Sequence, residues 1–129
     1  MYIYLKKELF KAIVLLVKEI NPSWIDKGVK YPKIDLHTWV ESPSSDKEQN
    51  IREISFVIEA YSNTSYEEAV SMANEVAEKI YSDFSLIAVK GAEIVSALPD
   101  GSEEIEEEDD NNIVLYRQLN RVLITLKLK

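Results

Sequence analysis

The chain has 129 residues, no cysteine, one histidine and a formal net charge of −8. The length fits one compact domain over residues 1–129, and the lack of cysteine excludes disulfides, cysteine metal sites and thiol nucleophiles. The acidic balance disfavours nucleic acid and anionic membranes as ligands, because phosphate binding requires clusters of lysine and arginine.

Residues 3–20 are predicted to form an amphipathic helix, which Asn21-Pro22 ends because proline disfavours helical geometry in the residue before it. Its apolar side chains recur at spacings of three and four and form one stripe: Leu5, Leu9, Ala12, Ile13, Leu16, Val17 and Ile20. Leu15 falls on the polar arc and Val14 lies at its margin. Both are either ordinary exposed apolar residues or a contact surface for a neighbouring subunit.

The apolar run within this helix, residues 9–17, is interrupted by Lys11. A membrane span requires about 20 apolar residues, and a secretory signal requires an uninterrupted apolar centre with a small-residue cleavage site. We expect neither. We therefore expect a protein that is made in the cytoplasm and has no membrane partner.

After a connection over residues 23–32, the alternating residues 33–41 are predicted to form a half-buried strand. One face carries Ile34, Leu36, Thr38 and Val40, and the other carries Asp35, His37, Trp39 and Glu41. His37 thus belongs to the more polar face. With no nucleophile motif around it, a surface or cross-strand role is favoured over catalysis.

Residues 51–62 are predicted to form a second strand, antiparallel to the first. Its core-facing side chains are Ile54, Phe56, Ile58 and Ala60. The opposite face carries Glu53, Ser55, Glu59 and Tyr61, with Val57 as the apolar exception. The polar loop over residues 42–50 is too long for a tight turn, and long loops often carry function. Its candidate contact residues are Asp46, Lys47 and Glu48.

A second helix is predicted to begin after Asn63, because Ser65 with Glu68, or Thr64 with Glu67, makes a capping box. Its apolar stripe consists of Tyr66, Ala69, Val70, Ala73, Val76, Ala77, Ile80, Tyr81 and Phe84. A third strand is predicted over residues 92–98, an earlier start over residues 86–89 being the alternative, and a fourth over residues 113–128. The order α-β-β-α-β-β predicts an α+β fold, with two helices packed on one face of a mostly antiparallel four-stranded sheet.

Between the last two strands, Pro99-Asp100-Gly101 is a turn signal and residues 103–110 contain seven acidic residues in eight. The acidic residues are Glu103, Glu104, Glu106, Glu107, Glu108, Asp109 and Asp110. Self-repulsion predicts an extended, solvated loop. Because the segment lacks the ligand spacing and central glycine of a calcium loop, binding of a divalent ion is its weaker interpretation.

No catalytic signature accompanies these elements. The chain has three glycines, at 28, 91 and 101, and contains neither a dinucleotide or phosphate loop nor an HExxH motif. No Ser/His/Asp order stands in a recognisable context. The paired carboxylates lie in a solvated run, which does not favour acid catalysis. We therefore predict no catalytic, cofactor-binding or metal-binding residue, and no enzyme.

Several patterns of residue type extend along the chain in a recognisable order. The amphipathic helix is followed by Tyr31-Pro32 and the alternating strand Ile34–Val40; the strand Ile54–Ser62 then runs into the helix that begins Tyr66-Glu67-Glu68-Ala69, and Arg121–Leu126 forms a late strand. In these features the whole chain resembles the tail terminator or tail-completion proteins of tailed bacteriophages, which act at the neck as head-to-tail connectors. The acidic segment 103–110 is longer and more charged than the family leads one to expect.

The resemblance implies a structural virion protein that forms a homo-oligomeric ring, of six copies or a multiple, at the neck or tail end. Such a ring joins the portal-side connector to the tail proteins, and its acidic lumen lets DNA pass without specific binding. Two alternatives remain open. One is a small acidic binding module or inhibitor that docks a basic partner through residues 103–110. The other is an enzyme that uses carboxylates and a divalent metal.

Overall fold

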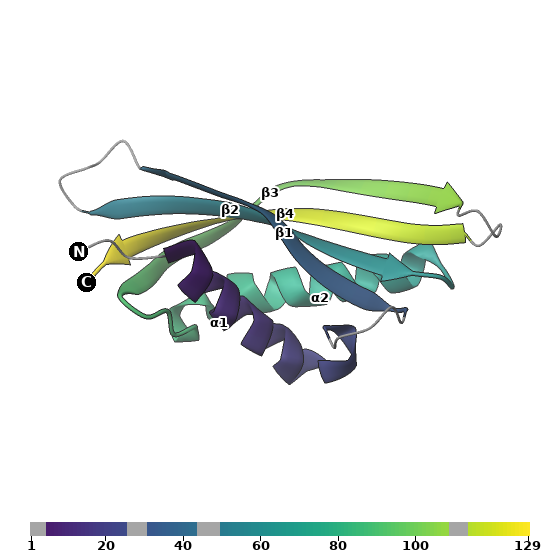
Figure 1. The fold of residues 1–129 in the computed structure, drawn as a ribbon, viewed down its shortest axis with the longest axis horizontal. Coiled ribbons are helices and arrows are strands. Elements are labelled where there is room, and N and C mark those ends of the chain that lie inside the picture. The colour runs from purple at the N-terminus through teal and green to yellow at the C-terminus, as the bar shows by residue number, and fades with distance from the viewer. Residues whose placement is uncertain (1–4, 26–30, 44–49, 109–113) are drawn as a thin grey trace.

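In a computed structural model of the protein, the described residues are 5–25, 31–43, 50–108 and 114–129. Two helices and four long strands follow in chain order: α1 (Leu5–Ile20), β1 (Lys33–Pro43), β2 (Ile51–Ser62), α2 (Tyr66–Asp83), β3 (Ala92–Glu108) and β4 (Val114–Leu128). The sheet has the order β1-β2-β4-β3, and every neighbouring pair is antiparallel. Both helices lie on the same face of the sheet (Figure 1), which confirms the predicted α+β fold.

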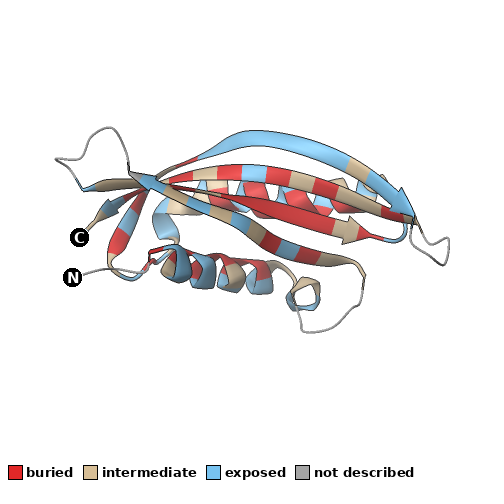
Figure 2. Ribbon diagram, turned by 45° about the horizontal axis from the view of Figure 1, so that its top comes forward, coloured by how far each residue is buried: buried red, intermediate tan, exposed pale blue. Residues whose placement is uncertain are grey.

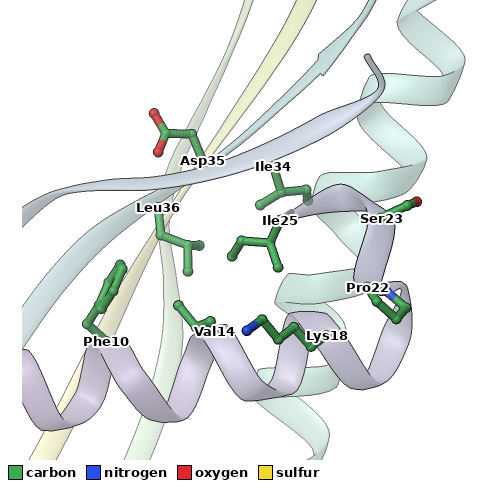
Figure 3. A pocket seen from close by; sticks show the side chains of 9 residues that line it. All are labelled: Phe10, Val14, Lys18, Pro22, Ser23, Ile25, Ile34, Asp35 and Leu36. Carbon is green, nitrogen blue, oxygen red and sulfur yellow. The ribbon is translucent and has the colours of Figure 1, made fainter. Parts of the chain in front are cut away.

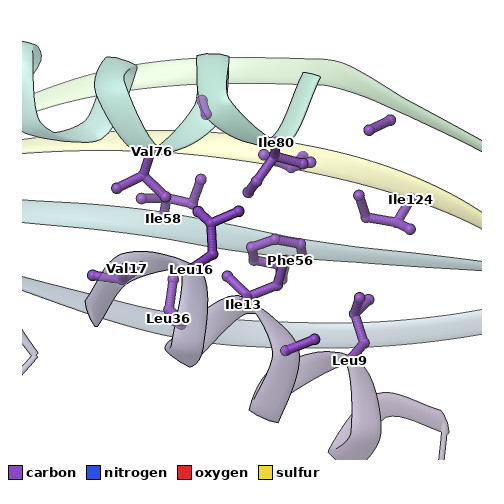
Figure 4. Close-up of a cluster of buried hydrophobic side chains, with 14 of the residues drawn as sticks. Leu9, Ile13, Leu16, Val17, Leu36, Phe56, Ile58, Val76, Ile80 and Ile124 are labelled. Carbon is purple, nitrogen blue, oxygen red and sulfur yellow. The ribbon is translucent and has the colours of Figure 1, made fainter. Parts of the chain in front are cut away.

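The hydrophobic core lies between the helices and the sheet (Figure 4). The stripe predicted for α1 packs against the inward-facing residues of β2, so that Leu9 and Ile13 lie near Phe56. From α2, Val76 and Ile80 complete this layer. The central strand β2 is buried over most of its second half, whereas the far half of the edge strand β3 is almost entirely exposed (Figure 2).

Local hydrogen bonds explain where α2 begins. The Ser65 hydroxyl accepts the Glu68 N–H at 3.1 Å, which satisfies one of the free amides of the first turn. Of the two predicted capping boxes, the structure forms only half of one, the cap by the Ser65 hydroxyl. The Glu68 carboxylate does not return to the Ser65 backbone; it accepts a hydrogen bond from the Ser62 hydroxyl at 2.6 Å. The Ser65 N–H instead donates to the Ser62 hydroxyl at 3.2 Å.

The alternation predicted for the first strand is wrong beyond His37. The register of β1 against β2 shifts between His37 and Val40, and Thr38 has a φ of +57°, which marks a β-bulge. One extra residue exchanges the two faces. Trp39 therefore stacks on Phe56 of the core, with ring centroids 4.3 Å apart. Thr38 and Val40, predicted to face the core, are exposed, while Glu41 pairs with the core residue Ile54 instead of lying on the opposite face.

The acidic segment also differs from the prediction. Instead of ending at residue 98, β3 continues to Glu108 and pairs with β4 along this length. Pro99-Asp100-Gly101 forms an irregularity within the strand, with Gly101 at a φ of +112°, and no turn that ends it. Because β3 is an edge strand, its carboxylates remain in water on both faces while the backbone pairs on one side only. The alternative start over residues 86–89 is also wrong, since a short 3-10 helix occupies Phe84–Leu86.

Candidate interaction surfaces

A groove of about 890 Å³ lies between α1 and the edge strand β1 (Figure 3). One flank of α1 contributes Phe10, Val14 and Lys18, which follow one another at intervals of four residues and therefore share a face of the helix. Ile34 and Leu36 of β1 form the facing wall, and Ile25 after the helix closes the end. We call this hollow the α1–β1 groove. Its walls are mainly apolar. Of the two charged residues that line it, Lys18 points into the groove, whereas the Asp35 carboxylate points away (Figure 3).

The opposite flank of α1 borders a second, smaller hollow of about 370 Å³, which α2 and the 3-10 helix after it complete. Leu15 and Leu86 line this hollow and expose 62% and 80% of their surface, more than the other exposed large apolar residues that the structure describes. We call these two residues the leucine patch. Glu19 borders it, as does an ion pair between Lys79 and Asp83 at 2.8 Å.

On the helix-free face of the sheet, a buried carboxylate ties three strands together. Glu59 of β2 is only 2% exposed. One of its oxygens lies 2.6 Å from His37 Nε2 of β1, and the other accepts a hydrogen bond from Arg117 Nε of β4. Arg117 Nη1 also donates to Glu107 of the acidic strand at 3.1 Å. Partial burial, followed by the charge of Glu59 and a hydrogen bond to it, raises the pKa of Tyr61 to about 12.

The carboxylate at the centre of this cluster is already fully paired. Both oxygens of Glu59 are engaged, and the side chain is almost completely buried. A general base must reach the proton that it removes, directly or through one water. The hydrogen bond to Glu59 raises the pKa of Arg117, so the guanidinium remains a permanent cation. The arrangement holds β1, β2 and β4 together, and His37 makes the cross-strand contact.

The acidic residues of β3 are divided between the two faces of the sheet. Glu103 and Glu107 pair with Leu119 and Leu115 on the helix-free face, whereas Glu104 and Glu106 lie on the helix side. There, partial desolvation and the charges of Glu106 and Glu104 raise the pKa of Tyr66. Within the ranges that the structure describes, no three histidine or carboxylate side chains converge enough to hold a metal ion. Within the same ranges, no helix is long and apolar enough to cross a membrane.

No family model and no curated protein matches this sequence. A comparison with solved structures finds a chain of the "Virion of native gene transfer agent (GTA) particle", with a TM-score of 0.71 over 97% of this chain and 99% of that one. The two chains share one fold. Their sequences are 10% identical, so the likeness is one of architecture and not of particular side chains.

The structure separates the two contact residues predicted on the first helix. Val14 lies in the α1–β1 groove, half-buried, while Leu15 belongs to the leucine patch on the other flank. The acidic residues Glu103 to Glu108 lie on β3. The remaining candidates, Asp46, Lys47, Glu48, Asp109 and Asp110, lie outside the described residues.

Sequence reasoning missed four residues of these surfaces. Phe10 was visible as an apolar residue off the main stripe, the same signal that singled out Leu15. The sequence pattern includes Leu86 in the alternative start of the third strand. In the structure Leu86 ends a 3-10 helix, and its side chain is exposed there. No local sequence pattern predicts the contact between Glu59 and Arg117, because the two residues lie 58 positions apart in the chain.

Proposed function

We propose that this chain is a structural protein of a phage-like particle, where its copies form a ring at the neck or tail end and join the head to the tail. The observation that carries the proposal is the shared fold with a virion chain over nearly the full length of both chains. The pattern resemblance to tail terminator proteins favours the same position in the particle.

Two features of the molecule are consistent with this function. An open, mainly apolar groove lies next to a sheet edge, and large apolar residues are exposed on the helices. Contiguous apolar surface of this kind marks protein–protein contacts. The net charge of −8 suits a channel through which DNA passes, since like charges prevent the phosphates from binding.

Intact particles provide the test. We expect mass spectrometry to find this chain in purified particles at a ring-like copy number, and electron microscopy to place it between head and tail. A strain that lacks the gene is expected to accumulate separate heads and tails, and re-expression of the chain is expected to restore joined particles. Complete particles that transfer DNA without this chain would refute the proposal.

A second candidate is an acidic binding module that docks a basic protein through β3. The observation in its favour is that Glu103, Glu104, Glu106 and Glu108 are exposed on an open sheet edge. Deleting the segment would remove the strand that pairs with β4, so the appropriate change is replacement of these four residues by glutamine. A binding module then loses its partner, whereas a ring subunit still assembles.

A further inference from the structure

The two flanks of α1 carry surfaces of different character. We propose that neighbouring copies join when the leucine patch of one copy packs into the α1–β1 groove of the next. The occupant of the groove is thus a second copy of this chain. The inference rests on the proposed ring function, for which it names the contact between subunits.

The placement of the two surfaces determines the symmetry of the contact. Val14 and Lys18 face the groove, while Leu15 and Glu19 border the leucine patch on the opposite flank of the same helix. Each copy therefore has two different surfaces, the groove and the leucine patch. A contact between two different surfaces is heterologous, adds every subunit by the same rotation, and closes into a ring when the rotation permits.

The apolar parts of the two surfaces complement each other. The groove is concave, has a volume of about 890 Å³ and is bounded by Phe10, Val14 and Ile25. Leu86 and Leu15 are the most exposed large apolar side chains there. Packing leucine side chains into an apolar hollow removes apolar area of both copies from water, which is the main driving force for association.

The charged groups favour the same pairing. Lys18 points into the groove, and Glu19 stands at the leucine patch, where Lys79 is already paired with Asp83. Packing patch into groove brings Lys18 of one copy near Glu19 of the next. A contact of two patches would instead bring the two Glu19 carboxylates together, which opposes association.

Two of the other exposed apolar residues lie away from this contact. Val40 and Leu98 pair with Ser55 and Leu123, which places them on the helix-free face of the sheet. The sheet separates them from both α1 surfaces, because the helices cover its other face (Figure 1). Val40 therefore serves as a control, since it is a valine like Val14 with an accessible side chain but lies away from the proposed interface.

Cross-linking tests the contact directly, because the chain has no cysteine of its own. The variants are Val14→Cys, Leu86→Cys and, as control, Val40→Cys, joined by a short bis-maleimide reagent. Mixing the Val14→Cys and Leu86→Cys proteins is expected to give covalent dimers at a rate roughly tenfold above either protein alone, since the contact holds the two thiols near each other. A chain with both substitutions is expected to give a ladder of multimers.

A second pair of variants tests the direction of the contact. Val14→Glu blocks the groove and Leu86→Glu blocks the patch, so each is expected to stop growth on its own. Mixed together, they retain one working contact and are expected to form a 1:1 dimer and nothing larger, as measured by mass photometry. Circular dichroism and thermal unfolding verify that each variant is folded.

Each outcome has a definite meaning. Cross-links of Leu86→Cys or Val14→Cys with themselves, or of Val40→Cys with Leu86→Cys, would overturn the proposed contact. The proposed contact is also overturned if the wild-type protein assembles, alone or in isolated particles, but the mixed cysteine variants do not cross-link under the same conditions. In that case the ring function survives without this interface. If the wild-type chain neither self-associates nor occurs in particles, the proposed function itself is refuted.

Discussion

Trp39 and Val40 are neighbours in β1. Because the bulge places them on opposite faces of the sheet, truncating each to alanine is expected to change the free energy of unfolding by very different amounts. Trp39→Ala removes a ring that stacks on Phe56 at 4.3 Å, meets Phe10 edge-on at 5.6 Å and donates a hydrogen bond to the Leu36 carbonyl at 3.3 Å. Val40→Ala trims a side chain that is 50% exposed and lies on the other face of the sheet.

The expected costs differ by a large factor. Loss of a fully packed tryptophan destabilises a protein by about 3–5 kcal/mol, and because Trp39 is only half-buried we expect about 3 kcal/mol for Trp39→Ala. That is a change of roughly 150-fold in the unfolding equilibrium. An exposed valine away from the core contributes within about 0.5 kcal/mol. Trp39→Phe, which keeps an aromatic ring over Phe56, is expected to lose about half as much as alanine.

Urea denaturation followed by circular dichroism gives the two free energies of unfolding, with no reliance on tryptophan fluorescence. Equal slopes in the two transitions would show that the variants unfold from comparable native states. The strict alternation read from the sequence requires the opposite order, since it places Val40 in the core and Trp39 outside. A larger cost for Val40→Ala than for Trp39→Ala would therefore refute the bulge and the assignment of faces that depends on it.

Further variants probe other parts of the molecule. Arg117→Met leaves the buried Glu59 with fewer partners and is expected to lower the free energy of unfolding by about 3 kcal/mol. Adding Glu59→Gln is expected to restore part of this loss, and no recovery in the double variant would contradict the pairing. Tyr61 has a pKa raised from 10.0 to about 12, so its contribution to stability is complete below pH 10 and is lost as the pH rises toward 12; Tyr61→Phe is expected to flatten alkaline denaturation over this range, and an unchanged curve would count against it. Ser65→Ala is expected to cost about 1 kcal/mol through loss of the α2 cap, and Thr64→Ala, a control whose hydroxyl caps no helix amide, clearly less; thermal unfolding compares the two.

Local patterns predict the elements of this fold well, because each depends on residues that are close in sequence. The stripe of α1 and the serine before α2 act within a few residues, and the core-facing alternation of β2 holds from Ile54 to Ala60. With these elements fixed, an antiparallel sheet covered by helices on one face is the arrangement that buries their apolar sides.

The errors arise where a strand departs from regular pairing. A bulge such as that at Thr38 depends on how two strands fit together, and a period of two carries no information about it. The same is true of the acidic segment, where repulsion between neighbouring carboxylates is outweighed by pairing with β4 and by the contact of Glu107 with Arg117. Charge within one segment does not reveal the strand beside it.

The interaction surfaces were predictable only in part for a similar reason. Leu15 stands out from a helical wheel, since an apolar residue on a polar arc is a local feature. The α1–β1 groove requires the distance between a helix and a strand, and the exposure of Leu86 requires the path of the chain after α2. Neither is encoded in the spacing of residues along one element.

The long acidic edge has a consequence for how the protein accumulates in a cell. An unpaired strand edge normally invites another strand to add to it, and identical chains can then polymerise without limit as fibres. On β3 the irregularity at Pro99–Gly101 bends that edge, and the carboxylates on both faces repel a second copy of the same strand. The β3 edge is therefore a poor template for aggregation, so copies can accumulate at high concentration without joining through this strand.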